Sequence, residues 1–94
     1  VLCFDVRQRL VGQEVVSVGI LDANLVHPRE VFACALKYRA ASIILAHNHP
    51  SGDATPSEED RLVTRRLQEA AKVMGIALLG HVVVTKTSLC SVED

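Results

Sequence analysis

Several features that mark other classes of protein are scarce or missing in this 94-residue chain. Tryptophan is absent and aromatic residues make up 3% of the sequence, so aliphatic side chains must supply most of the core. The net charge of −1 gives no general attraction to nucleic acid or to an acidic membrane. No apolar run reaches the roughly 20 residues of a membrane-spanning helix, and the first residues lack the basic and apolar regions of a signal peptide. We therefore expect no membrane partner.

Cysteines are few and show no pairing pattern. Cys3, Cys34 and Cys90 are odd in number and contain no C-x-x-C spacing. This suits reduced thiols in a cytoplasm better than a disulfide framework or a cysteine-based zinc site. We therefore expect a cytoplasmic protein in which these side chains pack and do not react.

The chain contains enough apolar material for one domain. Hydrophobic residues make up 49% of the sequence, and 94 residues suit a single domain with a modest core. No linker or internal repeat divides the chain. We expect residues 1–94 to form one domain and, because the chain starts at Val1 without a methionine, to be a fragment of a longer protein.

Apolar periodicity predicts strands and helices in the order β-β-α-β-α-β. The expected strands cover residues 1–6, 13–21, 42–46 and 76–85, and the expected helices cover residues 28–40 and 56–74. The second helix should begin with a capping box at residues 55–58, with Pro56 at its first position. This order favours an α/β fold in which helices flank a mixed β-sheet.

Two histidines follow the predicted strand at residues 42–46. His47 and His49 are two residues apart, so in an extended segment they point the same way. On the next helix, Ser57 and Asp60 continue the apolar spacing backwards and are expected on the core-facing side. A buried carboxylate needs a partner. His47, His49 and Asp60 are therefore candidate ligands of Zn²⁺, with a fourth position left for water as in catalytic zinc sites.

The spacing of these polar residues resembles the JAMM motif of the JAB1/MPN metalloprotease family. That motif reads His-x-His, seven residues, Ser, two residues, Asp, and it is matched by His47, His49, Ser57 and Asp60. The longer string HNHPSGDATPSEED at residues 47–60 is more specific. Together with residues 28–30 and 78–84 it is similar to the bacterial RadC proteins, a branch of that family. The similarity runs from Val1 to about Thr85.

The resemblance implies a curved-sheet α/β architecture, shared by JAB1/MPN and cytidine-deaminase-like domains, and zinc-dependent hydrolysis of amide or isopeptide bonds. The substrate would be a peptide or protein. In this family a glutamate near the start of a strand ahead of the histidines bonds the catalytic water, and Glu14 is the best match for this general base. Glu30 is the competitor, although a glutamate in a first helical turn has a simpler role against the helix dipole. Ser57 would steady the developing oxyanion.

A fourth histidine, His81, lies within the last predicted strand. A lone histidine there is more often a satisfied core or sheet-edge residue than a ligand, so we leave it out of the expected metal site. The RadC pattern commonly places an acidic residue before this histidine, where this chain has Gly80.

Two other functions compete with hydrolysis. The RadC name carries a historical link to DNA repair, and the predicted second helix carries Arg61, Arg65 and Arg66. Glutamates lie among these arginines, which indicates a solvated face of mixed charge, so nucleic acid is a partner that the charge does not support. The other alternative is a metal-binding interaction scaffold without turnover.

Overall fold

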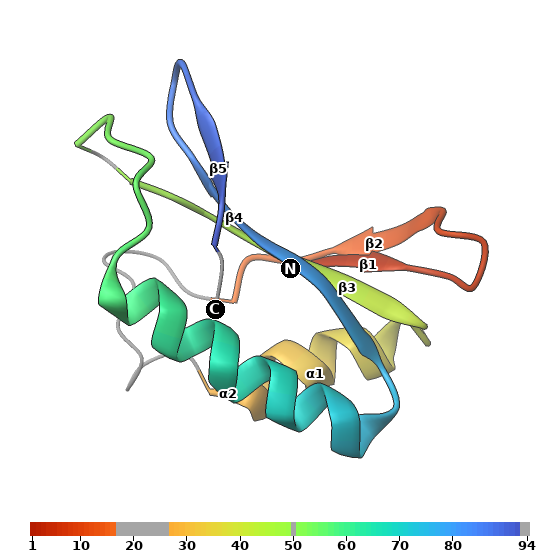
Figure 1. The fold of residues 1–94 in the computed structure, drawn as a ribbon. Helices are drawn as coiled ribbons and strands as arrows, with labels where there is room; N and C mark the ends of the chain where they lie inside the picture. The colour runs from red at the N-terminus through yellow and green to blue at the C-terminus, as the bar shows by residue number, and fades with distance from the viewer. Residues whose placement is uncertain (17–26, 50, 93–94) are drawn as a thin grey trace.

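The computed structural model describes residues 1–16, 27–49 and 51–92. Its strands are β1 (Leu2–Phe4), β2 (Leu10–Gln13), β3 (Ser42–Asn48), β4 (Ala77–Val84) and β5 (Leu89–Ser91), and its helices are α1 (Pro28–Lys37) and α2 (Glu58–Met74). Figure 1 shows both helices below the sheet. The α/β class with a mixed sheet and flanking helices, expected from the sequence, is confirmed.

The sheet has the strand order β2-β1-β3-β4-β5. β3 and β4 run parallel, whereas every other neighbouring pair is antiparallel. Parallel neighbours need a long crossover connection, which α2 supplies. The carboxyl ends of β3 and β4 therefore lie side by side, next to the loop that leads into α2 (Figure 1).

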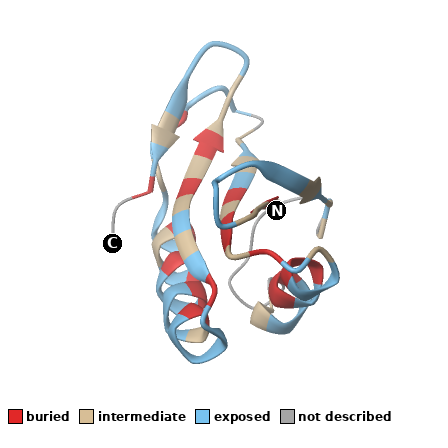
Figure 2. Cartoon of the chain, turned by 90° about the vertical axis from the view of Figure 1, so that its right-hand side faces the viewer, coloured by how far each residue is buried: buried red, intermediate tan, exposed pale blue. Residues whose placement is uncertain are grey.

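One apolar cluster joins both helices to the sheet. Its most deeply buried members include Cys3, Val31, Ile43, Val63 and Leu67. Figure 2 shows buried positions in red along the helices and the central strands. Because side chains alternate along a strand, Ile43 and Leu45 face the helices and His47 follows them on the same side. Neither described helix is long and apolar enough to cross a membrane.

The strand boundaries differ from those expected. The hairpin of the first two strands is present, but β2 covers Leu10–Gln13, so the described part of the predicted strand at residues 13–21 is in a strand only at Gln13. Residues 17–21 of that prediction lie outside the described residues. β3 extends two residues further than expected and includes His47, because His47 and Asn48 pair with Val83 and Val84 of β4. β5 was not predicted, and it forms a hairpin with β4.

The start of α2 also differs from the prediction. The N-cap is Ser57, and the capping box pairs it with Asp60, so the expectation of a box at residues 55–58 with Pro56 inside the helix was wrong. The backbone of Ser57 is extended, which places Pro56 before the cap. Ser57 is exposed and does not face the core as expected, whereas Asp60 is only 1% exposed. The helix ends before the left-handed Gly75 (φ +68°), as predicted.

Candidate metal centre

Three side chains with metal-binding atoms converge between the end of β3 and the start of α2. His47 and His49 come from the strand and the loop after it, and Asp60 comes from the first turn of the helix. One potential ligand atom from each residue lies within 4.8 Å of the other two. Within the described ranges, this is the one group of three or more such residues that could hold a metal ion.

The start of α2 fixes the orientation of the Asp60 carboxylate. Its Oδ2 accepts a hydrogen bond from the Ser57 backbone N–H at 2.6 Å, and the Asp60 N–H donates to Ser57 Oγ at 3.2 Å. These reciprocal bonds are those of a capping box. The other oxygen, Oδ1, points to His47 Nε2, 2.9 Å away. The helix terminus therefore holds one carboxylate oxygen and presents the other to His47.

His47 Nε2 and Asp60 Oδ1 are buried atoms without a hydrogen-bond partner, although they lie 2.9 Å apart. They would form an ion pair only if the imidazole were protonated. Burial lowers the pKa of His47 below its ordinary value and outweighs the attraction of Asp60, which favours the neutral ring. With the proton of the neutral ring on Nδ1, beside His81 Nε2, the two facing atoms are both acceptors, and acceptors left without a partner are costly inside a protein. A bound cation between them would satisfy both atoms, so this pair fits a metal site.

A backbone contact fixes the orientation of the His49 ring. Its Nδ1 lies 2.9 Å from the backbone oxygen of Asp53, and a carbonyl can only accept, so Nδ1 carries the proton. In the neutral ring the lone pair is then on Nε2, which lies 3.3 Å from Asp60 Oδ2. The loop that makes this contact turns at Gly52, whose φ of +86° favours glycine. His49 therefore directs a lone pair towards the carboxylate of Asp60.

Two residues outside the expected site contact it. His81 Nε2 lies 2.9 Å from His47 Nδ1, and His81 Nδ1 lies 2.7 Å from Thr64 Oγ1. Burial, assisted by the nearby imidazole of His47, lowers the pKa of His81 to about 4, so its ring is neutral at pH 7. The expectation of a satisfied core histidine is thus correct, but the residue that His81 bonds belongs to the candidate metal centre.

Both candidate bases lie outside the three-residue group. Glu14 follows β2, and its carboxylate pairs with Lys37 of α1. The hydrogen bond from Lys37, followed by that from Cys34, lowers the pKa of Glu14. Glu30 is exposed in the first turn of α1 and lies 3.7 Å from Arg29 Nε. Glu30 thus lies where the simple role against the helix dipole was expected, and Glu14 as general base stays a prediction.

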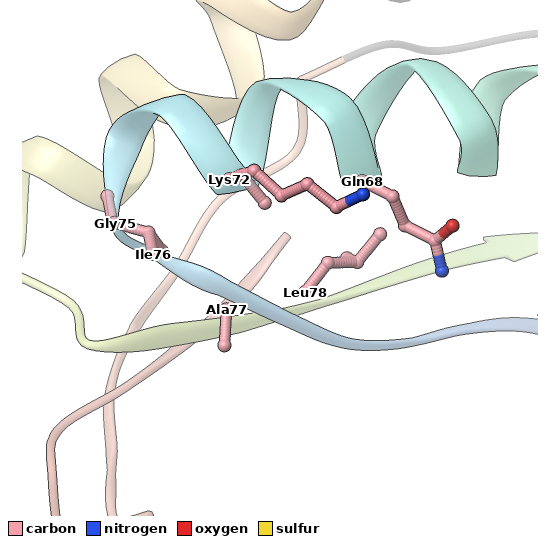
Figure 3. A pocket seen from close by; sticks show the side chains of 7 residues that line it. Gln68, Lys72, Gly75, Ile76, Ala77 and Leu78 are labelled. Atoms are coloured by element: carbon pink, nitrogen blue, oxygen red, sulfur yellow. The ribbon is translucent and has the colours of Figure 1, made fainter.

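Two surface pockets differ in their distance from the candidate metal ligands. One, of about 450 Å³, is lined by Asn48, His49, Gly52 and residues 84–87, so it opens beside a candidate ligand. The other, of about 550 Å³, lies between α2 and the start of β4 and is lined by Gln68, Lys72 and Leu78 among others (Figure 3). Because His47 pairs with Val83 near the far end of β4, this second pocket is remote from the metal centre.

Comparison with known proteins places the chain in a family. A family model described as RadC-like JAB domain matches residues 1–94. The chain is 43% identical over 94 residues to a UPF0758 protein of Thermotoga maritima, covering 100% of this chain and 42% of that protein. It is 52% identical over 93 residues to a UPF0758 protein of Syntrophomonas wolfei, covering 99% of this chain and 40% of that protein. The chain thus spans about two fifths of the length of these curated relatives. It belongs to the RadC-like JAB domain family.

Proposed function

We propose that this domain is a zinc-dependent hydrolase of amide or isopeptide bonds. The observation that carries the proposal is the buried pair of His47 Nε2 and Asp60 Oδ1, which lie 2.9 Å apart without a hydrogen-bond partner. With His49 Nε2 they offer two nitrogens and one carboxylate oxygen. Such a donor set suits Zn²⁺, and three protein ligands leave a fourth position open for chemistry.

Zn²⁺ bound by these residues would polarise the scissile carbonyl and make the attacking water more acidic. Glu14 would accept the proton of that water and pass it to the amine nitrogen as the C–N bond breaks. Its lowered pKa keeps the carboxylate ionised at neutral pH. Lys37 pairs with Oε1 of this carboxylate, so Oε2 is the oxygen outside that ion pair and would accept the proton.

Ser57 would donate a hydrogen bond to the oxyanion that forms on the substrate. Its Oγ accepts the Asp60 N–H, so its own hydroxyl proton remains to be donated. Ser57 is exposed, which suits contact with a substrate. The pocket of about 450 Å³ beside His49 offers room for a peptide or protein segment next to the ligands.

The first experiment measures metal content in the purified domain after zinc is supplied. We expect about one zinc per chain in the parent, and little in His49→Ala or Asp60→Asn. His27→Ala is the matched control, because His27 is a histidine outside the group. Circular dichroism checks the folding of each variant. A parent that holds no zinc would overturn the proposal.

Catalysis is tested separately on a panel of peptide and isopeptide substrates. Glu14→Gln should keep its zinc and lose most of the hydrolysis, typically a hundredfold or more when a general base is removed. Hydrolysis retained in Glu14→Gln but lost in His49→Ala would remove Glu14 from the role of base. Zinc bound at one per chain without hydrolysis of any substrate would favour the scaffold alternative.

A further inference from the structure

A buried series of hydrogen bonds links α2 through β4 to the candidate ligand His47. Thr64 Oγ1 donates to the backbone oxygen of Asp60 at 3.0 Å and lies 2.7 Å from His81 Nδ1. His81 Nε2 in turn lies 2.9 Å from His47 Nδ1. Thr64 is 3% exposed and His81 is 1% exposed, so both side chains are shielded from water. Their protons are therefore assigned from the neighbouring protein atoms.

The direction of each bond follows from the first one. A hydroxyl has a single proton, and we assign that of Thr64 to the Asp60 carbonyl, which can only accept. Thr64 Oγ1 must then accept from His81, so the proton of the neutral His81 ring is on Nδ1 and its lone pair is on Nε2. That lone pair requires His47 to donate from Nδ1. The lone pair of His47 is left on Nε2, which faces Asp60 Oδ1.

We propose that Thr64 and His81 are positioning residues that fix the tautomer of His47, so that its Nε2 is the atom offered to a metal ion. The tautomer of a ligating histidine is generally set by the bond that its other nitrogen makes. Here that bond is made to a second histidine, whose own tautomer is set by a threonine on another element. The role towards a metal rests on the proposed function, whereas the tautomers exist in the metal-free protein.

Replacing the Thr64 hydroxyl by a methyl group should reverse the direction of the hydrogen bonds between Thr64, His81 and His47. In Thr64→Val the side chain keeps its shape but cannot accept, so an Nδ1–H on His81 would be buried without a partner. The ring of His81 then favours the proton on Nε2, which it donates to His47 Nδ1. His47 is left with its proton on Nε2, the nitrogen needed for the metal. Thr64→Ser keeps a hydroxyl at this position and should preserve the original direction.

The direct test is long-range ¹H–¹⁵N NMR of the histidine rings in the metal-free protein, which distinguishes Nδ1–H from Nε2–H tautomers. We expect Nδ1–H at both His47 and His81 in the parent and in Thr64→Ser, and a shift of both towards Nε2–H in Thr64→Val. Circular dichroism and urea unfolding confirm that each variant is folded. An Nε2–H tautomer at His47 in the parent, or unchanged rings in a folded Thr64→Val, would overturn the proposal.

Zinc affinity, measured by competition with a chromophoric chelator, tests the consequence for the metal. Thr64→Val should bind zinc about 10- to 100-fold more weakly, as is common when a bond behind a ligand is lost. Thr64→Ser should restore most of the affinity. A Thr64→Val protein with reversed tautomers and unchanged affinity would overturn the role towards the metal. If the parent binds no zinc, the proposed function fails, whereas the tautomer assignment is still decided by NMR.

Discussion

At the scale of single residues, Asp60 combines a structural and a candidate chemical role. Its Oδ2 accepts the Ser57 N–H at the helix start, and its Oδ1 is left for a cation. Burial disfavours the charged carboxylate, but the hydrogen bonds from Ser57 help to hold the pKa of Asp60 below its ordinary value. The residue is thus prepared as an anion before any metal arrives.

Lys37 provides a test of the proposed base at the same scale. The hydrogen bond from Lys37 is the main cause of the lowered pKa of Glu14, so Lys37→Gln should raise that pKa towards its ordinary value. Glu14 must be deprotonated to accept a proton, and the variant should therefore lose activity at a higher pH as the solution is acidified. The measurement is the acidic limb of the profile of kcat/KM against pH.

The matched control for Lys37→Gln is Lys72→Gln. Lys72 lies in the last turn of α2, whereas the lysine that pairs with Glu14 is on α1. We expect the acidic limb of Lys72→Gln to coincide with that of the parent. An acidic limb that stays in place when Lys37 is replaced would mean that the group titrating there is not Glu14.

At the scale of elements, β2 and α1 approach each other unusually closely at Gly12. A Cβ built on Gly12 would lie 2.4–2.5 Å from ring atoms of Tyr38, the residue that caps α1. Gly12→Ala must therefore displace the ring or the strand, and we expect a destabilisation of about 1–3 kcal/mol. The measurement is the midpoint of urea unfolding.

Gly80 offers the matched control, because it is also a strand glycine and a Cβ added there would meet no atom within 4 Å. Gly80→Ala should not destabilise the domain, since alanine restricts the unfolded chain more than glycine does. If Gly12→Ala proves as stable as Gly80→Ala, the Tyr38 ring moves aside without cost, and the contact does not constrain the packing of β2 on α1.

The elements also explain what could and could not be predicted from sequence. His47, His49 and Asp60 could be brought together from local patterns alone, because strand alternation and helical spacing each fix a direction. His81 could not, since its contact with His47 depends on β4 pairing in parallel with β3 in one register, in which Leu45 lies beside His81. The role of Thr64 could not be predicted either, because it depends on the contact of Thr64 with His81.

The predicted start of α2 was wrong because it, too, depends on tertiary contacts. Thr55 and Ser57 are both residues that cap helices, and Pro56 is common in a first turn, so the local pattern allowed two starting points. The choice follows from tertiary structure, in which Asp60 is buried against the histidines and can still accept the Ser57 N–H. The exposure of Ser57 follows from that choice.

At the scale of the whole molecule, metal binding should appear as added stability. A ligand that binds only the folded state stabilises it by mass action, by about 4 kcal/mol when its concentration is 1,000 times its dissociation constant. We expect zinc to raise the thermal midpoint of the parent and of His27→Ala, and to leave that of His49→Ala unchanged. Differential scanning calorimetry measures all three. An equal rise in His49→Ala would show that zinc binds elsewhere.

The ligands also lie close together along the chain, with His47, His49 and Asp60 all within residues 47–60. A loop this short closes at modest entropic cost. The unfolded chain can therefore capture zinc weakly through the same imidazoles, and binding to the unfolded state reduces the stabilisation that a metal gives. The gain in stability should consequently fall short of the value calculated from the affinity of the folded domain, and zinc should already be attached to some chains when they begin to fold.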